Sequence, residues 1–241
     1  MQQVGRTQDH AQDRAQDHAE DDVQQGGAAV WSAAALLCDM DGTLVDSTRA
    51  IEQVWAALAV RHDLPRTEVL AALPGRTARD ILRLFLDDDR VVEEEAARVE
   101  RGQLAAPGVG PIPGAHRLLS GLPADRWAVV TAAPEAVARA RLVAAGLPEP
   151  KVLVAAESVT SGKPSPEGYR LAAERLGLPC ERCVVLEDAA VGVTAGHAAG
   201  ARVIGIGPGA QGADAVVPDL LSFTGLEVMG EEIRWSLGVQ R

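Results

Sequence analysis

The chain has 241 residues, with 34 acidic against 23 basic residues and a formal net charge of −11. Its length predicts one large domain or two smaller ones, and with 47% hydrophobic but only 3% aromatic residues the core must consist mainly of Ala, Val and Leu. An acidic chain with few aromatic residues argues against a nucleic-acid partner, which needs a basic face, and against binding to an anionic membrane.

The sequence carries no targeting signal that we recognise. No apolar run reaches the roughly 18–20 residues that cross a bilayer, and no basic segment followed by a hydrophobic one marks a signal peptide. Three cysteines are too few for a disulfide framework, so we expect a reducing, cytoplasmic setting. Cys180 and Cys183 have CxxC spacing, but no second CxxC exists, and we expect both to be structural.

The first 30 residues differ in composition from the rest of the chain. They repeat a Gln-Asp motif with a period of four and contain almost no apolar residue other than Ala. Six acidic and two basic residues give this segment a net charge of −4. Such a segment cannot bury enough apolar surface to fold, so we predict a disordered acidic tail over residues 1–30. Metal binding through His10 and His18 is the alternative.

From Ala33 onward, short apolar segments alternate with helical patterns, as in Glu135–Ala145 and Glu167–Leu176. The alternation predicts an α/β fold whose parallel sheet is covered on both faces. Such sheets place their chemistry at the carboxyl ends of the strands. The predicted strands are Ala33–Cys38, Trp127–Thr131, Lys151–Ala155, Cys183–Glu187 and Arg202–Ile206.

A long helical segment separates the first two predicted strands. It contains four helical patterns and ends in a Pro/Gly-rich linker, Ala106–Gly114. We predict that residues 48–113 form a helical insertion on two hinges, and that residues 31–47 and 114–241 form the core. Such an insertion often covers a site as a lid; the alternative is a subdomain that only adds stability. The helical patterns are Ile51–Ala59, Thr67–Leu73, Ala78–Leu86 and Val92–Arg101.

Two carboxylates, Asp39 and Asp41, directly follow the first predicted strand. Unpaired, they repel each other, and a divalent cation such as Mg²⁺ relieves that repulsion because hard cations favour carboxylate oxygens. Gly42 permits the tight turn that the chain needs beside a ligand. The pair therefore indicates a metal site, and an acidic turn that caps a helix is the alternative.

Polar residues also follow three other predicted strands. Thr131 ends the second strand, and its hydroxyl and the amides after it can donate to an anion. Lys163 follows the third strand, and Pro164 and Pro166 stiffen the segment around it. It is either a fixed positive charge for a phosphoryl group or a solvated lysine in a turn. Glu187 and Asp188 end the fourth strand and can complete the metal site, although Asp188 can also cap a helix.

These motifs occur in the order DMDGTLVDS (39–47), Thr131, Lys163 in GKPSP, and LEDAAVGVTAG (186–196). Together they resemble the haloacid dehalogenase-like superfamily of phosphotransferases, from Ala33 to the last strands. The resemblance implies a Rossmann-like parallel sheet core with an inserted small helical cap domain. Segments such as PIPGAHRLLSGL look like the branch that acts on phosphorylated sugars and polyols, and DGTLVDS looks more like its phosphatases than its mutases.

The resemblance also implies an activity and a role for each motif residue. It implies a Mg²⁺-dependent phosphatase in which Asp39 attacks phosphorus to form an aspartyl-phosphate and Asp41 serves as acid and base. The implied metal ligands are Asp39, the backbone carbonyl of Asp41, Glu187 and Asp188. The implied phosphate contacts are Thr131, the Ala132 amide and Lys163, and the implied substrate loop of the cap is Gly75, Arg76 and Thr77.

Two other functions remain open at this point. A mutase of the β-phosphoglucomutase kind would share every motif, because the cap decides whether water or a second sugar hydroxyl reaches the phospho-enzyme. A phospho-acceptor receiver domain also places acids, a hydroxyl and a Lys at strand ends, but receivers are about half this length and lack the insertion.

We expect a small phosphorylated metabolite as the partner, and we expect the protein to be a monomer or homodimer. Arg76 either binds that metabolite or pairs within the cap.

Overall fold

A computed structural model of the chain describes residues 29–238. The predicted acidic tail, with His10 and His18, lies outside the described residues, except that Ala29 and Val30 belong to the first strand.

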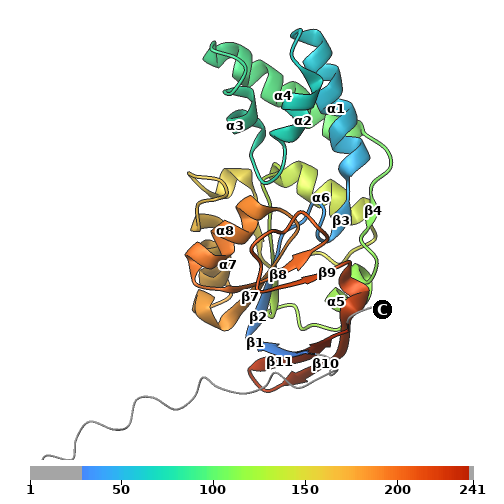
Figure 1. The fold of residues 1–241 in the computed structure, drawn as a ribbon, viewed down its shortest axis with the longest axis vertical. Coiled ribbons are helices and arrows are strands. Elements are labelled where there is room, and N and C mark those ends of the chain that lie inside the picture. The colour runs from blue at the N-terminus through green and yellow to red at the C-terminus, as the bar shows by residue number, and fades with distance from the viewer. Residues whose placement is uncertain (1–28, 239–241) are drawn as a thin grey trace, which may run out of the picture.

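A parallel sheet of six strands occupies the centre of the described chain (Figure 1). In spatial order the strands are β6 (Leu153–Val154), β5 (Trp127–Val130), β2 (Ala35–Cys38), β7 (Cys183–Glu187), β8 (Arg202–Ile206) and β9 (Ala215–Val217). The central strand β2 is buried on both faces: Ala35 and Leu37 belong to one apolar cluster, and Leu36 and Cys38 to the other. This arrangement explains the continuous apolar strand segments of the sequence and confirms the predicted α/β fold.

Helices cover both faces of this sheet (Figure 1). On one face lie α7 (Glu167–Arg175) and α8 (Ala190–Ala199), and on the other α5 (Ala115–Ser120) and α6 (Glu135–Ala144). Short 3₁₀ turns lie in three of the connections, η1 (Ala156–Ser158), η2 (Cys180–Arg182) and η3 (Leu220–Ser222). Cys180 and Cys183 are buried free thiols, and burial raises the pKa of Cys180 to about 11.

The helical insertion forms a separate bundle beyond one end of the sheet (Figure 1). It consists of α1 (Thr48–Arg61), α2 (Arg66–Ala71), α3 (Ala78–Leu82) and α4 (Asp89–Ala105). Two short strands, β3 (Val45–Asp46) and β4 (Gly110–Pro111), pair antiparallel where the chain enters and leaves the bundle. The bundle has its own apolar core, which includes Trp55, Leu58, Val69, Ile81 and Val99. We refer to residues 48–105 as the cap.

The predicted strand Ala33–Cys38 begins too early, because Ala33 belongs to a different strand. The chain forms β1 (Ala29–Ala33), breaks at Ala34, and begins β2 at Ala35. Strand β1 pairs antiparallel with β11 (Glu232–Leu237), which pairs with β10 (Phe223–Met229), so the chain has a second sheet that the sequence analysis missed. The apolar run continues across Ala34, and only the change of partner strand separates β1 from β2.

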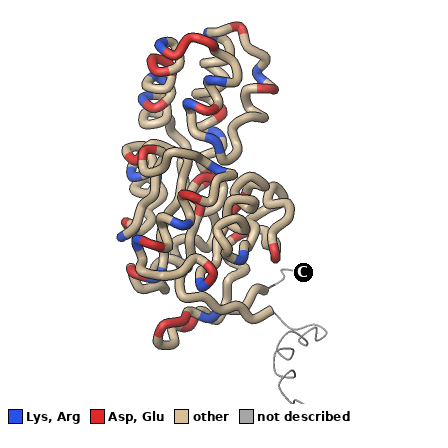
Figure 2. Tube along the Cα trace, turned by 90° about the vertical axis from the view of Figure 1, so that its left-hand side faces the viewer, with Lys and Arg blue, Asp and Glu red and all other residues tan. Residues whose placement is uncertain are grey.

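Figure 2 shows acidic and basic residues interspersed along both the cap and the core. Surface ion pairs accompany this mixture, such as that between Arg79 and Glu93 in the cap and that between Arg139 and Glu149 in the core. Within residues 29–238, none of the helices combines the length and the apolar character that crossing a bilayer requires.

Candidate active site

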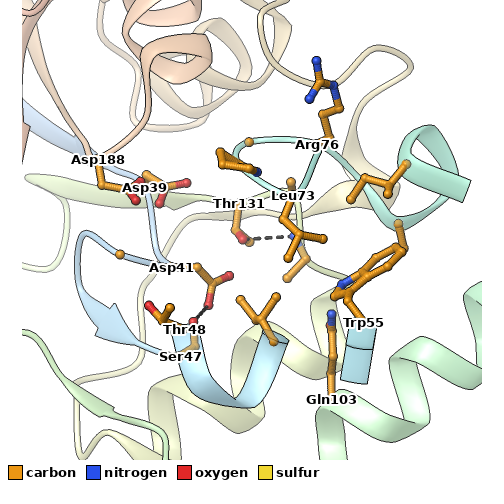
Figure 3. Close-up of a pocket in the computed structure, with 18 of the residues that line it drawn as sticks. Asp39, Asp41, Ser47, Thr48, Trp55, Leu73, Arg76, Gln103, Thr131 and Asp188 are labelled. Atoms are coloured by element: carbon orange, nitrogen blue, oxygen red, sulfur yellow. Dashed lines mark hydrogen bonds between the residues drawn. The ribbon is translucent and has the colours of Figure 1, made fainter. Parts of the chain in front are cut away.

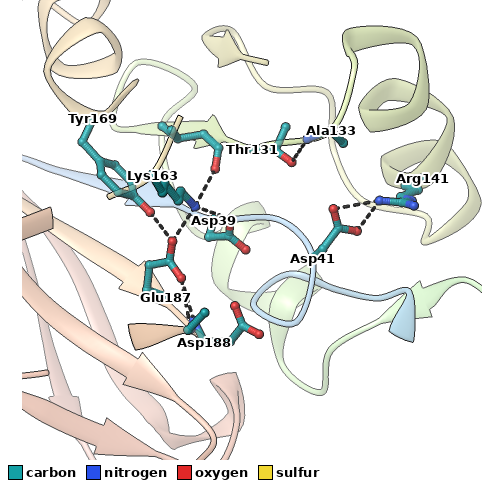
Figure 4. A network of polar contacts seen from close by, with 11 residues as sticks. Asp39, Asp41, Thr131, Ala133, Arg141, Lys163, Tyr169, Glu187 and Asp188 are labelled. Carbon is teal, nitrogen blue, oxygen red and sulfur yellow. Dashed lines mark hydrogen bonds and ion pairs between the residues drawn. The ribbon is translucent and has the colours of Figure 1, made fainter. Parts of the chain in front are cut away.

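The carboxyl ends of three neighbouring strands bring the sequence motifs together. Strand β2 lies between β5 and β7, so Asp39 stands between Thr131 on one side and Glu187 and Asp188 on the other (Figure 4). Lys163 reaches the same edge from the loop before α7. The structure therefore gathers residues that lie up to 149 positions apart in the chain around Asp39.

Lys163 lies between two carboxylates. Its Nζ donates to Asp39 Oδ1 at 2.5 Å and also to Glu187 Oε1. Burial alone would lower the pKa of Lys163, but the charges of Asp39 and Glu187 outweigh burial and hold it above its ordinary value. The side chain is therefore a fixed cation beside Asp39.

Glu187 uses both carboxylate oxygens within the protein. Its Oε1 accepts from Lys163 and from the Tyr169 hydroxyl at 2.7 Å, and its Oε2 accepts from the backbone N–H groups of Asp188 and Ala189. Glu187 thus orients Lys163. Tyr169 was not among the predicted site residues, although it is the only tyrosine of the chain and lies six residues after Lys163 in a predicted helix.

Asp39, Glu187 and Asp188 each present an oxygen within 4.8 Å of the others. Burial, together with the charge of Glu187, raises the pKa of Asp188 to about 7, and burial also raises the pKa of Asp39. Asp39 Oδ2 is buried and has no hydrogen-bond partner among the described residues. Crowded carboxylates with an unpaired buried oxygen are a donor set that fits a hard divalent cation.

Gly42 lets the loop after β2 approach this cluster. Its φ is +90°, and a Cβ at this position would lie 2.1 Å from Asp188 Oδ2. A side chain would therefore displace Asp188 from the cluster, and the backbone conformation also favours glycine.

The Asp41 side chain lies outside the acidic cluster. Its Oδ1 accepts from the Ser47 hydroxyl at 2.5 Å, and Arg141 Nη1 donates to Oδ1 and Oδ2 at 2.7 and 2.8 Å (Figure 4). The expected metal ligand at this position is the backbone carbonyl, so the carboxylate remains available for another role. Neither Arg141 nor Ser47 was among the predicted site residues. Arg141 lies 100 positions from Asp41, in helix α6.

A cavity of about 260 Å³ lies between the cap and the sheet edge (Figure 3). Asp39, Asp41, Thr131, Ala132 and Asp188 line it from the core. From the cap, Trp55 of α1 and Gln103 of α4 project into it on the side away from Asp39 (Figure 3). Apolar cap residues complete this side, including Ile51, Leu70, Leu73 and Ile81.

The predicted substrate loop of the cap reaches the cavity only in part. Gly75 and Arg76 line it, but the Arg76 guanidinium points away and Nη1 donates to Ala72 O at 3.1 Å (Figure 3). Thr77 does not line this cavity. Its hydroxyl accepts from the Asp80 N–H at 3.2 Å, so it caps α3.

Known proteins share both the sequence and the fold of this chain. The family model of haloacid dehalogenase-like hydrolases matches residues 33–200. Hexitol phosphatase A of Escherichia coli is 45% identical over 178 residues, which cover 70% of this chain and 81% of that protein. The 2-deoxyglucose-6-phosphate phosphatase 1 of Saccharomyces cerevisiae is 33% identical over 221 residues, which cover 80% of this chain and 90% of the yeast protein.

The solved structures extend this likeness to three dimensions. A hydrolase from Pseudomonas syringae is similar with a TM-score of 0.67 and 25% identity, and the match covers 78% of this chain and 94% of that one. The chain belongs to the haloacid dehalogenase-like hydrolases and is a phosphoric monoester hydrolase.

Proposed function

We propose that the protein is a Mg²⁺-dependent phosphatase that hydrolyses a small phosphorylated sugar or polyol through an aspartyl-phosphate on Asp39. The observation that carries this proposal is the environment of Asp39. One of its oxygens accepts a hydrogen bond from Lys163, the other is buried without a partner among residues 29–238, and the residue lines a cavity between the core and the cap.

The proposed reaction begins with Asp39. A carboxylate oxygen forms a bond to phosphorus as the bond from phosphorus to the alcohol oxygen breaks. Because an anion attacks an anionic ester, positive charge has to be present before the reaction starts, and the buried Lys163 supplies part of it. Thr131 directly follows β5 and lies beside Asp39, and its hydroxyl and the Ala132 amide would meet the other phosphoryl oxygens.

Asp41 would complete both half-reactions. It would donate a proton to the leaving alcohol oxygen and later remove a proton from the water that attacks the aspartyl-phosphate. Asp39, Asp188 and the backbone carbonyl of Asp41 would hold the metal ion, which would screen the repulsion between nucleophile and ester. Glu187, whose oxygens already accept four hydrogen bonds, would act through Lys163.

The cap side of the cavity suits a substrate with hydroxyl groups. Trp55, which is buried, and Gln103 bring an indole N–H and a carboxamide to the cap side of the cavity (Figure 3). Polar groups in such a site select ligands that can pair with them. The names of the two similar phosphatases, hexitol and 2-deoxyglucose 6-phosphate, fit this class.

Phosphate release from a panel of esters tests the proposal. The panel contains a hexitol phosphate, 2-deoxyglucose 6-phosphate, glycerol 1-phosphate and phosphoglycolate, each assayed with Mg²⁺ and with EDTA. We expect hydrolysis of the sugar and polyol esters, loss of activity in EDTA, and a fall of about 10³-fold or more in Asp39→Asn. Asp46→Asn, which alters an exposed acid nearby, is the matched control.

Two outcomes would contradict parts of the proposal. Undiminished phosphate release by Asp39→Asn would remove Asp39 as the nucleophile, and activity that resists EDTA would remove the metal. Incubation with β-glucose 1-phosphate and glucose 1,6-bisphosphate separates the mutase alternative, because a mutase forms glucose 6-phosphate whereas the proposed phosphatase releases inorganic phosphate.

A further inference from the structure

A buried arginine of α6 contacts the catalytic loop. The Arg141 side chain is 3% exposed, and its Nη1 donates to both carboxylate oxygens of Asp41 (Figure 4). The remaining guanidinium nitrogens, Nε and Nη2, are buried and have no hydrogen-bond partner among residues 29–238. Asp41 is therefore the one acidic partner of Arg141 in the described chain.

Stability alone does not account for this arrangement. Burying a guanidinium is unfavourable unless its donors are satisfied, and a buried arginine that only supported the fold would pair most of them. Here a single nitrogen makes both hydrogen bonds. Neighbouring residues of α6, such as Val137, Ala138 and Leu142, show that an apolar side chain suits the environment of this helix face.

The contact with Arg141 restrains the Asp41 side chain, which has few other restraints. Asp41 precedes Gly42, whose φ of +90° marks a turn, and its side chain is 21% exposed toward the cavity. Besides Arg141, only the Ser47 hydroxyl donates to it within the described chain. Arg141 approaches the Asp41 carboxylate from α6 of the core, and Ser47 is the residue directly before α1 of the cap. The two contacts together fix the direction of the carboxylate.

We propose that Arg141 is a positioning residue of the phosphatase reaction, which holds the Asp41 carboxylate in the orientation for proton transfer to the leaving oxygen and from water. This inference rests on the proposed role of Asp41. Arg141 lines the same cavity, but its side chain is only 3% exposed and its Nε and Nη2 atoms are buried, so we expect it to act through Asp41 and not on the substrate itself. Its removal should therefore lower kcat and leave KM nearly unchanged.

The variants Arg141→Met and Arg141→Lys test this role. Methionine keeps the length and removes every donor, and we expect kcat to fall by between about 10- and 100-fold, with KM within about twofold. Lysine keeps the charge and one donor group and should restore part of kcat. Arg139→Met is the control, because Arg139 lies in the same helix but pairs with Glu135 and Glu149 at the surface.

A double-mutant cycle with Asp41→Asn shows whether Arg141 acts through Asp41. In that background Arg141→Met should lower the residual kcat no further. An equal loss in both backgrounds, or wild-type kcat in Arg141→Met, would overturn the inference. Wild-type activity of Asp41→Asn would instead overturn the proposed role of Asp41. Melting temperatures identify an unfolded variant, and if Arg141→Met does not fold, the same cycle is run with Arg141→Lys.

Discussion

Tyr169 contacts both Glu187 and Lys163 of the active site. Its hydroxyl donates to Glu187 Oε1 at 2.7 Å, and Lys163 Nζ lies 5.2 Å from the centre of its ring. Burial and the charge of Glu187 both raise the pKa of Tyr169, so the hydroxyl remains a donor. One side chain thus stabilises both members of the Lys163–Glu187 pair, through a hydrogen bond and through a cation–π contact.

We predict that Tyr169→Phe lowers both stability and activity. The substitution keeps the ring and removes a hydrogen bond to a charged acceptor, which costs about 1.5–3 kcal/mol in the free energy of unfolding. We expect kcat to fall by several-fold because Glu187 loses one of the groups that orient it toward Lys163. Urea unfolding and steady-state kinetics measure the two effects. If both quantities equal those of the wild type, the hydroxyl does not support the pair.

At the scale of the elements, one cap loop touches one core helix. Gly75 has a φ of +68°, and a Cβ there would lie 2.3 Å from Val191 Cγ2 in the first turn of α8. The same position would lie 3.8 Å from Lys163 Cβ. The loop between α2 and α3 therefore rests on the part of the core that carries Lys163 and Asp188, and Gly75 is suited to this close approach.

We predict that Val191→Phe weakens catalysis by holding the cap away from the core. A larger side chain at a tight contact costs about 1–3 kcal/mol, which corresponds to a fall of roughly 5- to 150-fold in kcat/KM. Val191→Ala leaves room for the loop and should retain kcat/KM within about twofold. Val191 is altered in place of Gly75 because any side chain at Gly75 would also strain the backbone. Equal kcat/KM in the two variants would contradict this role of the contact.

At the scale of the whole molecule, the antiparallel sheet closes the end of the core opposite the cap (Figure 1). Trp235 stacks between Trp31 and Phe223, with ring centres 6.5 and 5.9 Å away. The Arg202 guanidinium lies 4.7 Å from the centre of the Trp31 ring. These aromatic rings belong to the same buried cluster as Leu36 and Leu186 of the parallel sheet, so the two sheets share one core.

We predict that Trp235→Ala destabilises the protein without changing its chemistry. Removing a large buried aromatic side chain costs about 3–5 kcal/mol, a large part of the 5–15 kcal/mol typical of a folded domain. Arg234→Ala, on the exposed face of the same strand, should change stability by less than about 0.5 kcal/mol. Thermal unfolding and kcat/KM of the folded protein check both. A large kcat/KM change in Trp235→Ala would show that the sheet influences the site.

Local patterns were sufficient to predict the fold class and the residues at the sheet edge. Apolar strand segments and helical periodicity predicted the parallel sheet, and this prediction is confirmed. Because parallel strands end at one edge, the recognised strands placed Asp39, Thr131 and Asp188 at the same edge, and the strand order β5-β2-β7 makes them neighbours. Their catalytic roles remain predictions. The chain breaks at Ala34 between β1 and β2, and no Gly or Pro in this segment marks the break.

The pairings that complete the site depend on tertiary packing. Arg141 contacts Asp41, 100 residues away in the chain, because of the way α6 packs on the sheet. An arginine in a helical sequence pattern does not by itself show which residue it will pair with. Arg76 turns away from the cavity and Thr77 caps α3, although both lie in the predicted loop, because side-chain direction depends on the local backbone. The sequence therefore specifies which groups reach the sheet edge, and long-range packing determines which groups hold them in place.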